Sequence, residues 1–402
     1  MVKAQSLLYA IYVCLILSLL CGALLYIANM YNQLNIFYNT REDLYFHNQS
    51  LINYALSNPD KTAIENDSEE IVQSAYEVKP YGMFSLLVAK SFTATDTITS
   101  AHFTASAITD QTCVFLPNLD SKPLSYSGDV KLIGKKMLPS DNIKTIYIDN
   151  KPNKLENKGS TTTSAASLPE ISESIKKSFE GFSAKTMLLK EAPQINGVYY
   201  NSFHQPAINI TLESAMLDIT ARGNMVISSP DSIIVKSSAK LTDVILRAPK
   251  IIFEDNFTGT LQAFASEKIV IGSNVMLGYP SSVCMYNTSL EKSSILIKSN
   301  SSVYGTLLLY GNNTIDIDKN SITIEKDAII ACDIYCTGKL ILKSNVYGSI
   351  YTNKFVHTTA STGYDNCLAD VEINPSKRPL YFMSVPLLTT EKKSYAAIKK
   401  LM

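Results

Sequence analysis

The stretch from Leu7 to Met30 constrains this chain most, because it is uncharged and mostly apolar. As an α-helix it would be about 36 Å long at a rise of about 1.5 Å per residue, which is enough to cross a bilayer. Lys3 precedes the stretch, and the next charged residues begin at Arg41. This asymmetry favours a cytoplasmic N-terminus. We therefore expect a single-pass protein of the inner or cytoplasmic membrane, with most of its residues in the periplasm or at the cell surface.

Three interpretations of this segment are open. A cleaved secretory signal is the first, but the apolar run is longer than the hydrophobic part of a usual signal and no clear small-residue cleavage site follows it. A plain single-pass anchor is the second, and the length of the run satisfies it. The third depends on the residues that lead into the run.

The segment Ala4-Gln5-Ser6-Leu7-Leu8-Tyr9 resembles the prepilin cleavage motif of type IV pilins and type II secretion pseudopilins. In that motif a small residue precedes the cut, and phenylalanine, threonine, leucine, isoleucine and glutamate follow it. Ala4 would take the small position, and Gln5 would stand where the family has its aromatic residue. The resemblance implies cleavage before Gln5 and assembly with other envelope or filament subunits.

Tyr9 stands where the family has its glutamate. In the family that carboxylate neutralises the amino terminus of the neighbouring subunit within the membrane, where an unpaired ionisable group is costly. A subunit at the tip of a filament has no neighbour above it and needs no such partner. The resemblance therefore implies a minor, tip-like subunit and speaks against a major repeating one.

The apolar pattern continues beyond the membrane-sized run. From Leu34 to Ala55 apolar residues recur at three- and four-residue steps, which is the period of an amphipathic helix. No Pro or Gly interrupts this part before Pro59. We predict one helix over residues 6–57, roughly 75 Å long. An ordinary juxtamembrane helix or a parallel coiled coil would show the same pattern.

Composition limits the remaining residues to a few classes. The 402 residues carry no formal net charge, and no basic block is present, which argues against nucleic acid as a partner. We expect a mainly β protein with a transmembrane and continuing helix at 1–57. The other predicted regions are a small β-rich region at 58–150, a linker with a short helix at 151–180, a parallel (right-handed) β-helix at 181–385 and a C-terminal tail or capping helix at 386–402.

The β-helix is predicted from a repeat of short apolar strands, each followed by a polar corner. The residues taken as equivalent in successive repeats are Ile271, Ile297, Ile317 and Leu342. A variable period of about 20–26 residues is typical of such solenoids. Asparagines mark the corners, where their side chains bond local backbone and tolerate left-handed conformations; they are Asn274, Asn300, Asn320 and Asn345. Antiparallel sandwiches or barrels are the alternative.

The style of this repeat resembles two known classes of protein. One is the pectate-lyase-like β-helix, and it implies a membrane-anchored enzyme that acts on polysaccharide. The other is the bactofilin-like β-helix, and it implies a scaffold that polymerises end to end. Neither resemblance rests on a diagnostic motif, and a fold alone does not fix a function.

Few residues carry the pattern of a catalytic or metal site. Asp316 and Asp318 alternate with isoleucines, so on a strand both carboxylates would face the same way and would suit calcium or acid–base work on a carbohydrate. The competing interpretation is a solvated outer face. No histidine has a partner at metal-ligand spacing, and nucleophile-elbow and nucleotide-binding motifs are absent from the sequence. We therefore expect no enzyme activity, no cofactor and no metal.

The seven cysteines do not form a disulfide framework. Cys14 and Cys21 lie in the apolar run and are expected to pack as small apolar residues. Five others remain, an odd number that cannot all pair within one chain. We treat them mainly as core residues and leave room for one disulfide.

Together these features favour a non-enzymatic, membrane-anchored envelope protein. The leading hypothesis is a minor pilin- or pseudopilin-like component that displays a rigid β-helix for adhesion or assembly. Its expected partners are the membrane, other envelope or filament subunits, and glycans.

Overall fold

The computed structural model describes residues 2–58, 61, 71–106, 112–148, 152–181, 185–287, 289, 291–311, 317–379, 381–383, 385, 387–388 and 395–401. The chain divides into two compact units. The first unit consists of Met1–Glu77 and Ala89–Ser100, and the second consists of Val78–Val88 and Ala101–Met402.

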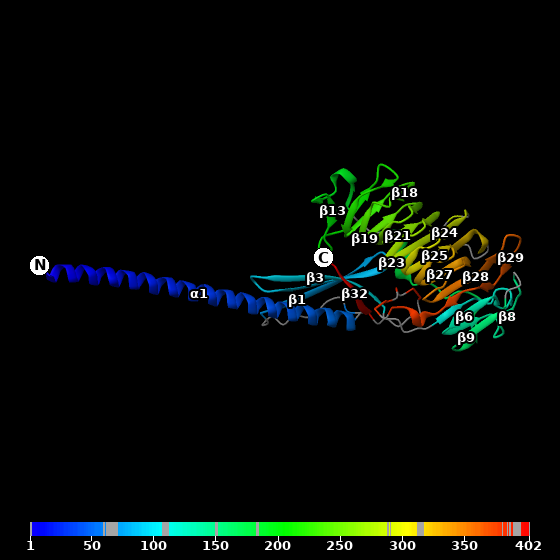
Figure 1. Cartoon of the computed structure of the whole chain (residues 1–402), viewed down its shortest axis with the longest axis horizontal. Helices are drawn as coiled ribbons and strands as arrows, with labels where there is room; N and C mark the ends of the chain where they lie inside the picture. Colours follow the sequence, from blue (N-terminus) through cyan, green and yellow to red (C-terminus); the bar gives the residue numbers. More distant parts are fainter. Residues whose placement is uncertain are drawn as a thin grey trace. The chain divides into compact units, whose positions relative to one another are not determined.

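The first unit is dominated by one continuous helix, α1 (Val2–Ser57), shown in Figure 1. Side chains from residue 6 to residue 39 are exposed along its whole circumference. The segment Ser6–Ser57 is long and apolar enough to cross a membrane by length and composition. The predicted long N-terminal helix is therefore present and contains a candidate membrane span.

The last turns of α1 pack on strand residues within the same unit. Leu44, Leu51 and Ile52 are buried at helical spacing. Between them lies Asn48, whose Nδ2 donates to the carbonyl of Ala89 at 3.2 Å, while its Oδ1 accepts from the hydroxyl of Ser100 at 2.5 Å. The C-terminal part of the apolar stripe predicted from the sequence is thus the face on which α1 rests, whereas Leu34, Phe37 and Tyr45 of the same stripe are exposed.

The strand residues in question belong to a four-stranded sheet with the order β1-β2-β3-β32. Its strands are β1 (Gln73–Tyr81), β2 (Phe84–Phe92), β3 (Thr97–Ser106) and β32 (Tyr395–Leu401). In the second unit β32 runs antiparallel to β3, from Ala101 opposite Leu401 to Ser106 opposite Tyr395. The predicted C-terminal helix or tail is therefore wrong for these residues, because their backbone completes the sheet beside β3.

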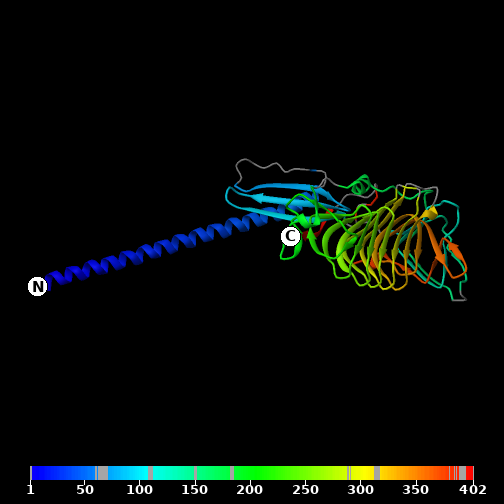
Figure 2. The ribbon, with the colours of Figure 1, turned by 90° about the horizontal axis from the view of Figure 1, so that it is seen from above.

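Most of the second unit consists of parallel strands paired in long ladders. In the first ladder Ile210 lies opposite Ile227, and Leu307 lies opposite Ile334. Figures 1 and 2 show its central strands side by side in chain order. Its strands are β11 (Lys185–Leu188), β14 (Ile208–Thr211), β17 (Met225–Ser228), β19 (Lys240–Arg247), β21 (Thr258–Ala265), β23 (Met276–Asn287), β25 (Ser302–Gly311), β27 (Ile329–Leu342) and β28 (Ile350–Thr358). The predicted mainly β fold is confirmed, with a large parallel sheet.

A second parallel ladder corrects the repeat that was read from the sequence. Its strands are β15 (Met216–Leu217), β18 (Ser232–Val235), β20 (Lys250–Phe253), β22 (Lys268–Ile271), β24 (Ser293–Ile297) and β26 (Asn320–Ile324), followed by the end of β27. Ile271 pairs with Ile297, Ile297 with Ile324, and Ile324 with Leu342. Ile317 was taken as the third member, but it lies in the 3-10 helix η2 (Ile317–Lys319) before the strand.

A third ladder joins β13 (Val198–Asn201) and β16 (Thr220–Gly223) to the first halves of β19, β21, β23, β25 and β27. The five long strands therefore pass from this ladder into the first. Between the two parts the register shifts, for example between Thr242 and Val244. Before this ladder lie η1 (Leu189–Glu191) and β12 (Gln194–Ile195), which pairs antiparallel with β13.

Strands within residues 112–148 and 152–163 continue these ladders at the end where β28 lies. Ile350 of β28 pairs with Val114 of β4 (Thr112–Phe115), and β4 pairs with β7 (Lys135–Leu138), which pairs with β10 (Thr161–Thr163). Beside them β30 (Cys367–Ala369), β5 (Ser125–Ser127) and β8 (Lys144–Thr145) form one three-stranded sheet, and β31 (Glu372–Ile373), β6 (Asp129–Ile133) and β9 (Lys154–Lys158) form another.

This arrangement differs from the predicted small β-rich region and linker. Residues of β4 and β6 share one hydrophobic core with strands of the second half of the chain, as Val114 and Leu132 show. The stretch 152–167 forms strands β9 and β10 where a flexible linker was expected. Its polar composition is that of an edge strand, since β9 is the last strand of its sheet.

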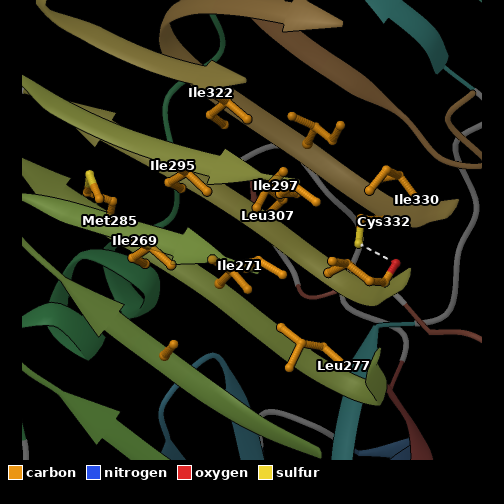
Figure 3. Close-up of a cluster of buried hydrophobic side chains, with 14 of the residues drawn as sticks. Ile269, Ile271, Leu277, Met285, Ile295, Ile297, Leu307, Ile322, Ile330 and Cys332 are labelled. Atoms are coloured by element: carbon orange, nitrogen blue, oxygen red, sulfur yellow. Dashed lines mark hydrogen bonds between the residues drawn. The ribbon is translucent and has the colours of Figure 1, made fainter. Parts of the chain in front are cut away.

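The core lies between the ladders and is built from stacked aliphatic side chains. Figure 3 shows Ile269, Ile271, Ile295 and Ile297 pointing into it from β22 and β24, with Leu307 from β25. All five side chains are fully buried. Fully burying each side chain contributes roughly 1.5–3 kcal/mol relative to leaving it exposed. The apolar alternation of the repeats is thus explained by one inward face per strand.

Side chains of other elements also cover the outer face of the first ladder. The sequences of its strands are therefore continuous apolar runs. Phe264, Leu308 and Tyr335 belong to a second buried cluster, together with Met83 and Ile175. Ile175 lies on the short helix α2 (Glu173–Glu180), which falls in the segment 151–180 where a linker with a short helix was expected. Strands buried on both faces lose the alternation of a half-exposed strand.

The corner asparagines only partly follow the prediction. Asn274 and Asn300 adopt left-handed backbone, with φ of 57° and 60°. Nδ2 of Asn274 also donates to Oδ1 of Asn256, in the preceding repeat, at 3.3 Å. Asn320, in contrast, is buried at the start of β26, where its Oδ1 accepts from Ser293. Asn345 is exposed and caps the backbone of Glu372.

All seven cysteines lie among the described residues, and all are free thiols. Burial raises the pKa of Cys113 and of Cys336 to about 12. Such thiols stay protonated and unreactive at neutral pH. The expectation of core residues therefore holds for the five cysteines outside α1, and the disulfide left open by the sequence is not formed.

Candidate functional site

A cavity of about 550 Å³, with both polar and apolar groups in its lining, lies in the second unit, where strands of the second and third ladders are joined by corners. It is lined by residues of six separate segments, namely Lys326, Asp327, Lys343, His357, Thr358, Thr359, Ala360, Ala369, Asp370, Ser127 and Ile148. We call this cavity the corner pocket. Its volume lies within the range of about 300–1,000 Å³ that is usual for small-ligand sites.

One wall of the corner pocket comes from two successive corners. Lys326 and Asp327 follow β26, and Lys343 follows β27. The backbone N–H of Lys343 donates to the carbonyl of Ile324 at 3.0 Å. Asp327 has φ of 62°, a left-handed conformation that Asp tolerates better than most residues. These two corners thus contribute two lysines and a carboxylate to the lining of the pocket.

Buried Ser344 holds these two corners together. Its hydroxyl donates to the carbonyl of Glu325 at 2.6 Å and accepts from the backbone N–H of Ala328 at 3.0 Å. On the other side, the carboxylate of Glu325 accepts from the N–H and the hydroxyl of Ser299, both at 3.1 Å. The corner that carries Lys326 and Asp327 is therefore fixed from both neighbouring repeats.

A hairpin of β28 and the following strand contributes another part of the lining. His357 on β28 pairs with Tyr364 of β29 (Gly363–Asp365). At its tip the hydroxyl of Thr359 donates to the carbonyl of Thr362 at 3.0 Å and accepts from the N–H of the same residue. The hairpin brings His357, together with the hydroxyls of Thr358 and Thr359, to the edge of the pocket.

Two residues of the lining, Ser127 and Ile148, are buried. Ser127 and Ile148 are joined by a hydrogen bond of 3.2 Å from the N–H of Ile148 to the serine hydroxyl. At one end stands Asp370, whose carboxylate accepts from the N–H of Asp129 at 3.1 Å. The lining therefore combines charged groups, hydroxyl groups and the apolar side chain of Ile148, an arrangement that suits a polar ligand with several hydroxyl groups.

The residues singled out from the sequence lie elsewhere or only at the rim. Asp318 is exposed in η2, where its Oδ1 is 3.8 Å from the Nζ atoms of both Lys339 and Lys354. The predicted strand with two parallel carboxylates is therefore wrong for Asp318, and Asp316 falls outside the described residues. Within the described part of the chain, no three His, Cys, Asp or Glu side chains gather in a way that would hold a metal ion.

The N-terminal positions of interest all lie in α1. Tyr9 is exposed on the helix. Ala4 and Gln5 belong to its first turns, and their side chains fall outside the description. The pocket residues had no signal of their own in the sequence, because they come from separate segments with no shared spacing.

Comparison with known proteins adds little to this picture. No protein-family model matches the sequence, and no curated protein matches it. One solved structure, the competence-associated pilin ComZ from Thermus thermophilus, aligns over 85% of this chain and 85% of its own at 8% identity, with a TM-score of 0.23. Values of this size do not establish a common fold.

Proposed function

We propose that this chain is a non-enzymatic, membrane-anchored envelope protein of pilin-like build, which displays a β-helix for adhesion or assembly. The observation that carries the proposal is α1 itself. Its residues 6–39 expose apolar side chains, whereas Leu44, Leu51 and Ile52 pack on strand residues of the same unit. Pilin-type subunits have this plan, with one half of a long helix free and the other half on a globular head.

The start of α1 supports a minor subunit. Ala4 and Gln5 stand at the cleavage position of the prepilin-like motif, and Tyr9 replaces its glutamate. Tyr9 brings no carboxylate into the apolar segment, so it has no charge to offer to the amino terminus of a neighbour. A single copy at the end of an assembly would not need one. The N-terminus would then lie in the cytoplasm and the second unit outside.

The parallel ladders support a β-helix as the displayed part. Three ladders run through the same sequence of repeats, and β19, β21, β23, β25 and β27 pass from one ladder into the next. A solenoid of this kind buries one continuous core and offers long outer faces. Such a body would serve as a stiff surface for contact with other molecules.

The bactofilin-like alternative, a scaffold that polymerises end to end, is disfavoured by the edge strands. β8 and β9 end their sheets and carry lysines, as Lys144, Lys154 and Lys158 show. Charged edge strands are the usual protection against pairing with a further copy. The polysaccharide-cleaving alternative loses its main support, since Asp318 lies in η2 and faces Lys339 and Lys354.

Intact mass spectrometry of the mature protein, purified from membranes, tests the proposal. Prepilin-type processing gives a chain that begins at Gln5, with an N-methyl group on that residue. Replacement of the small residue, Ala4→Phe, should leave the chain uncleaved and provides the control. A wild-type chain that retains Met1 would mean a plain anchor, and one that begins after Met30 would mean a secreted protein; either result contradicts the pilin-like proposal.

A further inference from the structure

The charged side chains of the corner pocket balance one another. Two of them are basic, Lys326 and Lys343, and two are acidic, Asp327 and Asp370. A ligand with a net charge would be attracted by one pair and repelled by the other. A neutral ligand rich in hydroxyl groups can use all four side chains, because a hydroxyl accepts a hydrogen bond from an ammonium group and donates one to a carboxylate.

Three of these charges are not consumed by other protein charges. Over the residues that the structure describes, Lys326, Asp327 and Lys343 take part in no ion pair. Elsewhere on the same ladders lysines do find partners, such as Lys236 with Glu254 at 2.6 Å. Lys326 and Asp327 are also exposed, so their polar ends are accessible to a ligand in the pocket.

The fourth charge, that of Asp370, is held in a fixed place. Its backbone is left-handed, with φ of 52°, and its N–H donates to the carbonyl of Ser127 at 3.2 Å. Its Oδ1 accepts from the N–H of Asp129 at 3.1 Å and lies over Gly128, where a Cβ atom would collide with it. A carboxylate accepts several hydrogen bonds, so Asp370 can receive a ligand hydroxyl in addition to this backbone donor.

A second hollow, of about 210 Å³, shares Asp370 with the corner pocket. Its charged lining consists of three carboxylates, from Asp129, Asp370 and Glu372, and one ammonium group, from Lys131. This excess of acceptors repels anions and favours a ligand that donates hydrogen bonds. Because Asp370 belongs to both linings, a chain of hydroxyl-bearing units can pass it and occupy both hollows.

The rest of the lining of the corner pocket suits the other parts of a sugar. A sugar ring carries hydroxyls around its edge and C–H groups on its faces. Thr358 is exposed and offers a hydroxyl to the edge of a ring. Ala360, Ala369 and Ile148 offer small apolar surfaces to its faces. A zwitterion, the other class that a balanced pocket would admit, leaves these apolar surfaces and the carboxylates of the second hollow unused.

We propose that the corner pocket binds a neutral linear saccharide. Hydroxyls of one sugar would donate to the carboxylates of Asp327 and Asp370. Oxygen atoms of the same sugar would accept from the ammonium groups of Lys326 and Lys343, and these charge-assisted hydrogen bonds are the strong ones. The next sugar would lie beyond Asp370 in the second hollow. This inference rests on the proposed display function and gives it a ligand class.

Titration calorimetry tests the inference on the full-length protein, in micelles of a detergent without a sugar headgroup. The probes are four neutral tetramers, namely cellotetraose, maltotetraose, mannotetraose and N-acetylated chitotetraose. The comparison ligands are an anionic alginate tetramer, the cationic deacetylated chitotetraose and the zwitterion diglycine. We expect saturable binding of at least one neutral tetramer, with an affinity that changes little as salt is raised, because no ion pair with the ligand is screened.

Three results of this titration would overturn the proposal. One is the absence of binding by all four neutral tetramers. Another is tighter binding of either charged tetramer or of diglycine than of every neutral tetramer. The third is binding that is lost as salt is raised, since that would mean recognition by net charge.

Matched variants locate the site and test its chemistry. K326Q and D327N should each weaken binding of the neutral tetramer about tenfold or more, as expected for the loss of one charge-assisted hydrogen bond. Asparagine tolerates the left-handed backbone at position 327, so D327N keeps the corner. In a site for an anion, D327N would instead strengthen binding, because it removes a repulsion.

Two further variants provide the control. K292Q and D120N remove the same charges from exposed residues outside the pocket and should leave the affinity unchanged. Thermal unfolding of all four variants should match the wild type, which confirms that they fold. Unchanged affinity in both pocket variants, tighter binding in D327N, or equal weakening in the control variants would contradict the assignment.

The outcome is separable from the test of the proposed function. A chain that is processed at Gln5 but binds no neutral tetramer would sink only the pocket. A chain that binds a neutral tetramer but keeps Met1 would sink only the pilin-like assignment.

Discussion

Arg378 and Asp333 form a bidentate ion pair inside the second unit. Nη1 of Arg378 donates to Oδ2 of Asp333 at 3.0 Å, and Nη2 donates to Oδ1. The side chains are only 6% and 8% exposed. The backbone N–H of Ser349 donates to the same carboxylate at 3.1 Å. Because Arg378 follows η3 (Pro375–Lys377), the pair fastens the chain after β31 to β27 in the first ladder.

Removal of the carboxylate should destabilise the second unit strongly. In Asp333→Ala the guanidinium of Arg378 stays buried without its partner, and we expect a loss of about 3–5 kcal/mol in unfolding free energy. Urea unfolding of the full-length protein, followed by circular dichroism, measures the loss. The double variant D333L/R378M replaces both charges by apolar groups and should lose less than D333A.

An exposed ion pair provides the control for this prediction. On α2, Nζ of Lys176 lies 2.7 Å from Oε1 of Glu173, and the glutamate side chain is largely in solvent. Glu173→Ala should change stability far less than D333A, since exposed pairs contribute little. Equal losses in the two variants would mean that the Arg378 pair is not desolvated in solution.

The side chain of Gln262 should hold the β1–β2 turn in place. Its Oε1 accepts from the N–H of Met83 at 2.7 Å, and its Nε2 donates to the carbonyl of Tyr81 at 3.0 Å. In Q262L both backbone groups lose their partner, at a cost of about 1–3 kcal/mol for each buried group. Hydrogen exchange should become faster in residues 78–88. Q262E keeps the acceptor for Met83, so the N–H of that residue should stay better protected than in Q262L.

Asn48 should determine how firmly the end of α1 is attached within the first unit. N48L removes the bonds to the carbonyl of Ala89 and the hydroxyl of Ser100 and leaves these groups unsatisfied. We expect a loss of about 1–3 kcal/mol and faster proteolysis between residues 40 and 57. E42Q changes an exposed residue of the same helix and should behave as wild type. Unchanged proteolysis in N48L would mean that apolar packing alone fixes the helix.

The helix and the parallel repeats were predictable because their signals are local. The buried face of α1 repeats every three or four residues, and the strands around Ile271 and Ile297 repeat one short pattern. The third repeat was misplaced, because Ile317 stands in the same alternating pattern as a strand. Only the pairing of Ile297 with Ile324 shows that the strand of this repeat is β26, which begins after Ile317.

The strands that pair with β28 and continue the ladders, beginning with β4, lacked such local signals in the sequence, and so did the corner pocket. Val114 pairs with Ile350, far along the chain, and a parallel pairing of that kind leaves no mark near either residue. The polar stretch 152–167 has the composition of a linker as well as that of an edge strand. The corner pocket is assembled from Lys326, Lys343, His357 and Asp370, which belong to several repeats. No fixed spacing in the sequence therefore indicates it.

His102 should make the protein less stable in mild acid. It lies on β3, is 8% exposed, and pairs across the strands with Lys400. Burial, and to a smaller degree the charge of Lys400, lowers the pKa of His102 in the folded protein. The unfolded chain has the ordinary value of about 6.5 and therefore binds the proton first as the pH falls. Stability is consequently lost as the pH drops through about 6.5 and towards the lower folded pKa.

His102→Gln removes this titration and should flatten the pH dependence. The thermal midpoint of the wild type should fall more between pH 7.5 and pH 5 than that of H102Q, with carboxylate contributions common to both. H47Q, which changes an exposed histidine on α1, should retain the wild-type fall. K400Q should reduce the fall in part, because it removes the neighbouring charge. Parallel curves for the wild type and H102Q would show that His102 is protonated in the fold as easily as in the unfolded chain.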